Sequence, residues 1–174
     1  LPDLRQRYTL RLVDVRATDA RGRHVAGVEV ADLAGSERRR YAHLFRGVDA
    51  VLHLGYRRPD VRTTGVWGAD PGALETFEAE LANVRMAHNV YRCALDAGVR
   101  RVVAASSNHA ADWYEHALVH AGRRDLVSPA DLPLSDNFYG WSKAAYVLLG
   151  FVYASGSLGR KLEVFLLRIG APRD

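Results

Sequence analysis

Short apolar runs alternate along the chain with longer helical patterns and polar loops. Runs rich in β-branched and aromatic residues predict strands at residues 8–15, 25–30, 50–54, 101–105 and 162–168. The run AVLHL at residues 50–54 is stopped by Gly55 and is typical of a central parallel strand buried on both faces. His53, inside this run, is expected to be a hydrogen-bonded histidine of the core.

Helical periodicity is clearest in one long segment. Bulky side chains recur there at three- and four-residue spacing, namely Phe77, Leu81, Val84, His88, Tyr91 and Leu95. The pattern predicts a helix over residues 75–97, ended by Gly98. Further helices are predicted over residues 36–46, 113–122 and 140–155, and Ser36 can cap the first of them.

The predicted elements alternate between strand and helix. Such alternation indicates a parallel sheet covered by helices on both faces, which is the doubly wound, Rossmann-type α/β fold. A length of 174 residues suits a single domain over residues 1–174. Ligands of this fold bind beyond the carboxyl ends of the strands. The residues at those places are Asp14, Asp32, Gly55, Ser106, Ser107, Asn108, His109 and Gly170.

A Tyr-x-x-x-Lys motif, Tyr139 and Lys143, lies at the start of a predicted helix. The spacing places both side chains on one helix face. An ammonium beside a phenol stabilises the phenolate, which makes the phenol a usable general acid and base for interconverting an alcohol and a carbonyl. Ordinary surface pairs share this spacing, so the motif gains its weight from the segments around it.

The sequence Ser106-Ser107-Asn108-His109 directly follows an apolar predicted strand. A serine hydroxyl at that place can bond the substrate oxygen that Tyr139 protonates or deprotonates. The alternative is that the serines merely cap the next turn, which is a common use of this residue. The Tyr-Lys pair downstream favours the catalytic interpretation.

Two acids follow the first two predicted strands. Asp14 stands where a dinucleotide-binding fold carries a carboxylate that grips the ribose hydroxyls of adenosine. A carboxylate there repels a 2′-phosphate, so NAD is favoured over NADP, although Arg16 nearby weakens this preference. Asp32 and Leu33 can hold the adenine ring, the acid by accepting from its amino group and the leucine by packing on its face. A plain surface aspartate is the alternative for Asp14.

Five segments in chain order carry a family resemblance: VDV with Arg16, ADLA, VDAVLHLG, SSNH with YGWSK, and LRIG. From about Tyr8 to Gly170 the chain resembles the extended short-chain dehydrogenase/reductase family, also called the NAD-dependent epimerase/dehydratase family. Within that family, SSNH after the fifth strand is similar to uronate dehydrogenases, which oxidise C1 of a hexuronate to an aldarolactone with NAD.

The resemblance implies a role for each matching residue. The catalytic set would be Ser107, Tyr139 as acid and base, and Lys143 as its activator. The residues that would line the NAD site are Asp14, Asp32, Leu33, Leu54, Gly55, Asn83, Ser106, Tyr139 and Lys143. Asn83 would support the site through backbone and water contacts. The residues that would face the substrate are Ser107, Asn108 and His109.

The chain departs from the family pattern in four places. The Gly-x-x-Gly-x-x-Gly turn that cradles a pyrophosphate at a helix N-terminus is absent from the sequence. We expect residues 2–7 to be the tail of the helix that follows this turn, and the first strand to be missing from this chain. Residues 56–59 replace a serine-containing segment, residues 113–136 form an insertion, and the chain stops before the substrate-binding segments.

Composition and charge exclude several classes of function. The net charge is +4, but the arginines are scattered in short runs, so a nucleic-acid partner is not expected. No apolar run approaches the ~20 residues that cross a bilayer, and no membrane partner is expected. The single cysteine, Cys93, excludes an internal disulfide, is expected to be a buried thiol, and favours a cytoplasmic location. The histidines show no ligand spacing, so no metal site is expected.

The main hypothesis is an enzyme that transfers a hydride between NAD and a sugar-like or uronate-like alcohol. A nucleotide-sugar epimerase or dehydratase of the same family is the near alternative. A non-catalytic, cofactor-binding regulatory protein is the alternative from another class. The resemblance also implies a homodimer through the two long helices, residues 75–97 and 140–155, whose apolar faces permit such pairing.

Overall fold

The computed structural model describes residues 2–60 and 72–170. In this part of the chain the strands form two parallel sheets. The first sheet pairs β1 (Leu12–Asp14) with β2 (Val28–Val30). The second has the order β3-β4-β5, with β3 at Ala50–His53, β4 at Arg101–Ser107 and β5 at Glu163–Ile169. The predicted α/β class with parallel strands is confirmed.

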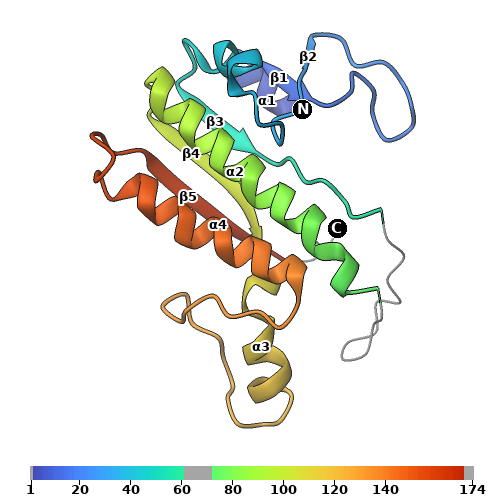
Figure 1. Cartoon of the computed structure of the whole chain (residues 1–174), viewed down its shortest axis with the longest axis vertical. Coiled ribbons are helices and arrows are strands. Elements are labelled where there is room, and N and C mark those ends of the chain that lie inside the picture. Colours follow the sequence, from blue (N-terminus) through green and yellow to red (C-terminus); the bar gives the residue numbers. More distant parts are fainter. Residues whose placement is uncertain (1, 61–71, 171–174) are drawn as a thin grey trace.

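Two long helices, α2 (Phe77–Ala97) and α4 (Phe138–Ala154), lie side by side across the second sheet (Figure 1). α2 ends at Gly98, whose φ of 81° is the left-handed conformation that lets its N–H bond back to the last turn. Both long helices agree with the sequence pattern to within two residues at each end. The remaining α-helices of the described residues, α1 (Pro2–Arg7) and α3 (Asp112–Tyr114), are short.

The helix predicted over residues 36–46 is wrong in kind. The chain forms two 3-10 turns there, at Arg38–Arg40 and Ala42–Phe45. Tyr41 separates them, because its ring is buried and its hydroxyl donates to the carbonyl of Gly35 at 2.8 Å. This tertiary contact fixes the backbone between the turns and interrupts a continuous helix.

Two further boundaries differ from the sequence pattern. The helix predicted over residues 113–122 is an α-turn, α3, followed by a wider π-type turn at Glu115–Val119. The strand predicted over residues 8–15 is limited to β1, because its ladder with β2 contains three residue pairs. Strand length is therefore set by the pairing partner rather than by the longer apolar run.

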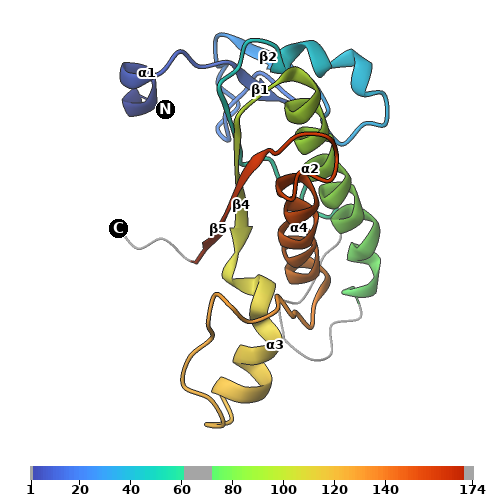
Figure 2. The same ribbon diagram turned by 90° about the vertical axis from the view of Figure 1, so that its left-hand side faces the viewer.

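One face of the second sheet lacks the predicted helical cover. Figure 2 shows α2 and α4 on the same side of the sheet, with α1 on the opposite side near β1 and β2. On the face away from α2 and α4, apolar side chains of β3 and β5 are about half exposed, and these are Leu52, Phe165, Leu167 and Ile169. The expectation of cover on both faces is thus wrong for the described residues.

The hydrophobic core lies between α2, α4 and the second sheet. Its largest fully buried side chains include Tyr91, Tyr146 and Leu162. Cys93 is buried in this cluster as expected, and burial raises the pKa of its thiol to about 11. His53 is also buried, but the prediction of a hydrogen-bonded histidine is wrong for one atom, because its Nε2 has no partner in the described residues.

β1 and β3 are edge strands of separate sheets, although both carry residues that the family resemblance assigns to the cofactor. β1 pairs only with β2, and β3 pairs only with β4 within the described residues. In a doubly wound sheet the corresponding strands flank a central strand. No helix in residues 2–60 and 72–170 is long and apolar enough to cross a membrane.

Candidate active site

The start of α4 packs directly against the turn that follows β4. Asn137 caps the helix, because its Oδ1 accepts from the N–H of Gly140 at 2.8 Å. A Cβ at Gly140 would collide with the carbonyl oxygen of His109 and with Ser135. Only glycine permits this close approach, which brings Tyr139 beside the turn at the carboxyl end of β4.

Tyr139 and Lys143 lie on the first turns of α4, as the motif predicts. The Nζ of Lys143 lies 5.8 Å from the centre of the Tyr139 ring. The same ammonium donates to the carbonyl of Ala105 on β4 at 3.3 Å. The lysine thus links helix α4 to the strand that leads into Ser107.

Lys143 is 4% exposed and is surrounded by aromatic rings. Its Nζ lies 5.0 Å from the ring centre of Tyr56 and 4.7 Å from that of Tyr146. Burial lowers the pKa of Lys143, and the nearby Glu80 carboxylate partly opposes this change. The aromatic rings and the Glu80 carboxylate offset part of the free-energy cost of burying this ammonium next to the Tyr139 phenol.

A buried hydrogen-bond network centred on Glu80 supports this arrangement. Glu80 lies on α2, is 1% exposed, and accepts from the hydroxyls of Tyr56 at 2.5 Å and Ser142 at 2.6 Å. Its Oε2 also accepts from the amide of Asn83 at 3.3 Å. Burial and the bond to Glu80 raise the pKa of Tyr56, so its hydroxyl stays a donor. The Tyr56 ring in turn meets the edge of the Tyr139 ring, with centroids 5.5 Å apart.

Asn83 holds the loop that follows β3. Its Oδ1 accepts from the N–H of Arg57 at 2.8 Å, and its Nδ2 donates to the carbonyl of the same residue at 2.9 Å. The backbone carbonyl of Asn83 accepts from the hydroxyl of Tyr146 at 3.1 Å. Asn83 therefore acts on the site through the backbone of residues 56–57.

The last two residues of β4, Ser106 and Ser107, form different contacts. Ser106 is buried, and its Oγ donates to the backbone carbonyl of Lys143 at 3.3 Å. Ser107, the last residue of β4, is also buried. The Oγ of Ser107 accepts from the N–H of His109 at 3.2 Å and caps the turn Asn108–Ala111. This is the capping contact that the alternative interpretation describes.

The residues expected to face the substrate are accessible at the end of β4. Asn108 and His109 are both exposed. The His109 ring meets the Tyr139 ring at a steep angle, with centroids 5.6 Å apart. The structure therefore brings His109 and Tyr139 together, whereas no contact joins Ser107 to Tyr139 among the described interactions.

The residues assigned to the adenosine half of a dinucleotide lie at the carboxyl ends of β1, β2 and β3. The Asp14 carboxylate is exposed and accepts from the N–H of Arg16 at 3.2 Å, within its own turn. Asp32 accepts from the N–H of Ala34, and Leu33 packs against the core. The last two such residues, Leu54 and Gly55, are exposed after β3.

Sequence reasoning missed several residues that organise the site. Tyr56 and Glu80 surround Lys143, and Asp112 and Asn137 connect His109 to the start of α4. Asn89 holds the loop after β2 by donating to the carbonyl of Leu33 at 2.8 Å. The only sequence signal was that Glu80 and Asn83 interrupt the apolar stripe of α2 at helical spacing.

Two curated proteins similar to this chain are sugar dehydrogenases. L-arabinose 1-dehydrogenase (NAD(P)(+)) of Haloferax volcanii is 33% identical over 132 residues, which are 72% of this chain and 46% of that protein. Uronate dehydrogenase of Pseudomonas syringae pv. tomato is 34% identical over 142 residues, 79% of this chain and 42% of that protein. The chain belongs to the extended short-chain dehydrogenase/reductase family. No model of a protein family matches the sequence.

Solved structures place this extended short-chain dehydrogenase/reductase chain among the same enzymes. MoeE5 in complex with UDP-glucose and NAD has a TM-score of 0.68 at 25% identity, covering 96% of this chain and 48% of that one. A mutated uronate dehydrogenase has a TM-score of 0.67 at 26% identity, covering 99% and 55%. The chain spans about half the length of the curated relatives it matches. The family is one of NAD-dependent sugar dehydrogenases and epimerases.

The side chains present fit the dinucleotide that this family uses. The Asp14 carboxylate is exposed and could accept from ribose hydroxyls beside its bond from Arg16. The buried Nε2 of His53 has no partner, and its ring lies beside Gly55, where a Cβ would approach it to 3.4 Å. Among the described residues Lys143 forms one hydrogen bond, to Ala105, and an ammonium has three donors, so this side chain could also donate to a ribose.

Proposed function

We propose that this protein is an NAD-dependent dehydrogenase that oxidises a sugar-like or uronate-like alcohol through Ser107, Tyr139 and Lys143. The observation that carries the proposal is the placement of Lys143, buried between the Tyr139 ring and the carbonyl of Ala105 at the carboxyl end of β4. This is where a doubly wound sheet binds its ligands. Similarity to the arabinose and uronate dehydrogenases supports the substrate class.

In this proposal each residue moves or holds a proton at a defined atom. The Tyr139 phenolate oxygen takes the proton of the substrate hydroxyl. The Lys143 ammonium stabilises the phenolate and donates to ribose hydroxyls, while Ser107 Oγ leaves its capping contact to bond the substrate oxygen. NAD, when bound, supplies the hydride acceptor.

The cofactor would be held mainly by polar groups at the strand ends. Asp14 would accept from the adenosine ribose hydroxyls, and Asp32 with Leu33 would contact the adenine. Leu54 and Gly55 would contact the dinucleotide just beyond the end of β3. Ser106 and Asn83 would hold the surrounding backbone in place. Each of these roles is part of the proposal.

Replacing Tyr139 with Phe tests the proposal. Y139F removes only the phenolic oxygen, so NAD-dependent oxidation of L-arabinose or D-glucuronate should fall by 10²-fold or more. Turnover is followed by NADH absorbance, and folding by circular dichroism. The control is Y8F, which changes an exposed tyrosine and should leave turnover unaltered. Turnover of Y139F within about tenfold of the wild type would contradict the general-base role.

A nucleotide sugar is the second candidate substrate. MoeE5, whose solved complexes contain NAD with UDP-glucose or with UDP-glucuronic acid, is similar over 96% of this chain. Assaying UDP-glucose and UDP-glucuronate beside the free sugars distinguishes the two candidates. Preference for the UDP-linked forms would favour an epimerase or dehydratase reaction at the same tyrosine.

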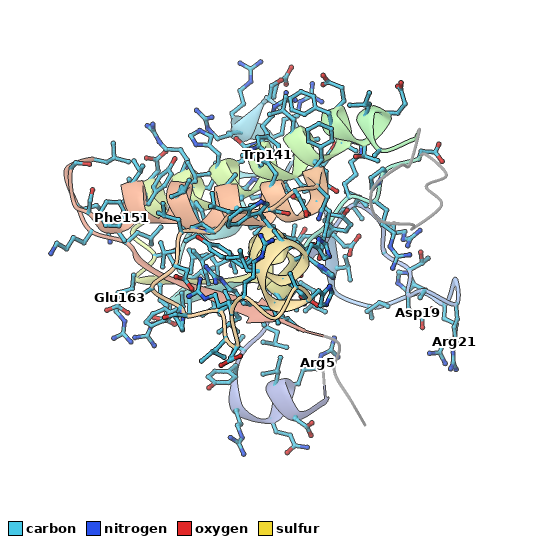
Figure 3. All side chains as sticks on the ribbon, turned by 90° about the horizontal axis from the view of Figure 1, so that it is seen from below. Arg5, Asp19, Arg21, Trp141, Phe151 and Glu163 are labelled. Carbon is cyan, nitrogen blue, oxygen red and sulfur yellow. The ribbon has the colours of Figure 1, made fainter. Side chains whose placement is uncertain are left out.

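A homodimer through α2 and α4 belongs to the same proposal. α4 exposes apolar side chains on its outer surface, among them Phe151, which is 73% exposed, and Trp141. Figure 3 shows both on this helix. Burying such a face against a second copy would remove it from water. Sedimentation of the wild type and of F151K checks this, because the charged variant should be monomeric.

A further inference from the structure

His109 forms a close pair with a buried carboxylate. Its Nδ1 lies 2.9 Å from each of the two oxygens of Asp112. Asp112 is 4% exposed, whereas the His109 side chain is 51% exposed. A buried carboxylate that engages one ring nitrogen leaves the opposite nitrogen, Nε2, on the accessible side of the imidazole.

The pair is tied to the start of α4. Asn137 donates from Nδ2 to Asp112 at 2.8 Å, and its Oδ1 caps the helix through Gly140. Asp112, Asn137 and the first turn of α4 therefore form one connected unit. This unit sets the edge contact of the His109 ring with Tyr139, at 5.6 Å between centroids.

The carboxylate decides which nitrogen of the imidazole carries the proton. Ionised Asp112 can only accept, so Nδ1 of a neutral His109 must be the donor. Nε2 is then a lone-pair acceptor. An acceptor beside the phenolic group suits a second hydroxyl of the substrate, such as the one on the carbon next to the carbon that is oxidised.

We propose that Asp112 is a positioning residue that fixes His109 as the Nδ1–H tautomer, and that His109 Nε2 accepts from the substrate hydroxyl on the carbon next to the one oxidised. The inference rests on the proposed dehydrogenase function and narrows its substrates to those with two neighbouring hydroxyls. The site thereby selects a polyhydroxylated sugar over a simple alcohol.

The first test reads the tautomer without any substrate. Imidazole ¹⁵N chemical shifts of the wild type should show His109 as the Nδ1–H form. In D112N the new amide can donate to Nδ1 while its oxygen still accepts from Asn137, so His109 should change to the Nε2–H form. E115Q is the control, because the Glu115 carboxylate lies 3.6 Å from Nε2 of another histidine of the same segment, His120. A wild-type Nε2–H tautomer, or one unchanged by D112N, would overturn the role of Asp112.

The second test reads the substrate contact. For whichever of L-arabinose and D-glucuronate is oxidised faster, D112N and H109Q should raise KM about tenfold, with a smaller change in kcat. The 2-deoxy analogue should lose kcat/KM with the wild type by a similar factor, and should be insensitive to either variant. Equal effects of D112N on the sugar and on its deoxy analogue would overturn the substrate contact. If neither sugar is oxidised, the proposed function is wrong. The ¹⁵N measurement of the His109 tautomer then still tests whether Asp112 positions His109.

Discussion

His53 is a buried imidazole whose Nε2 lacks a hydrogen-bond partner in the described residues. Burial lowers its pKa to about 4, and the Lys143 ammonium contributes in the same direction. The unfolded chain, with an ordinary histidine pKa near 6.5, binds this proton more readily. His53 therefore leaves stability intact above pH 6.5 and reduces it progressively as the pH falls from 6.5 towards 4.

Replacing His53 with Leu removes this titration and keeps a side chain of similar volume. Between pH 7 and pH 5 we expect the wild type to lose about 2 kcal/mol more of its free energy of unfolding than H53L does. Urea unfolding at both pH values measures the difference. H43L changes an exposed histidine and should behave as the wild type. Equal losses in the wild type and H53L would show that folding does not lower the pKa of His53.

Asp14 is the residue on which cofactor choice should depend. In the active enzyme, D14S should weaken NAD binding about tenfold, because charge-assisted bonds to two ribose hydroxyls are lost. The preference for NAD over NADP should narrow, since the carboxylate no longer repels a 2′-phosphate. Dissociation constants for both cofactors test this. An unchanged ratio would move the discrimination to another residue, with Arg16 the first to examine.

At the scale of elements, the pairing of α2 with α4 positions Tyr139 and Lys143. Glu80 of α2 accepts from Ser142 of α4 and from Tyr56 of the loop after β3. Three elements thus meet at one buried carboxylate beside Lys143. Neither helix alone could place the lysine, because its surroundings come from all three.

E80Q tests this junction. The amide group cannot accept from both hydroxyls as the carboxylate does, so the free energy of unfolding should fall by about 1–3 kcal/mol. The pKa of Lys143 should also fall further, because Glu80 opposes the effect of burial. E78Q, an exposed position on the same helix, is the matched control. Unfolding within 0.5 kcal/mol of the wild type, an order-of-magnitude limit for surface changes, would show that Glu80 is not a structural junction.

Over the whole molecule, β1 with β2 and β3 with β4 and β5 form separate sheets. The residues proposed to bind the cofactor are divided between them, with Asp14 in β1 and Gly55 just after β3. The sequence also contains no glycine-rich turn that could cradle a pyrophosphate. The proposed dinucleotide contacts therefore lie on two separate sheets.

Residues 1–174 produced as a separate chain should therefore fold marginally and bind NAD weakly. β1 and β3 each have one edge without a strand partner in the described residues, and the sequence contains no glycine-rich turn for a pyrophosphate. Calorimetric titration with NAD measures the affinity, and thermal unfolding measures the stability. Micromolar binding by this chain would show that NAD binding does not need a glycine-rich turn.

The sequence by itself determined the parallel α/β class, both long helices and the Tyr139–Lys143 pair. These features follow from periodicity and i, i+4 spacing, which are local properties of the chain. The length of β1 and the break at Tyr41 were not predictable, because a ladder partner and a distant carbonyl decide them.

Tertiary structure alone decided what surrounds the motif. Glu80 is separated from Tyr56 by 24 positions and from Ser142 by 62, and Asn137 is separated from Asp112 by 25. No spacing rule relates such distant positions, and only the packing of α2, α4 and the strand ends brings them together. The sequence by itself identified Tyr139, Lys143 and His109. Only the fold showed that the carboxylates of Glu80 and Asp112 lie beside Lys143 and His109.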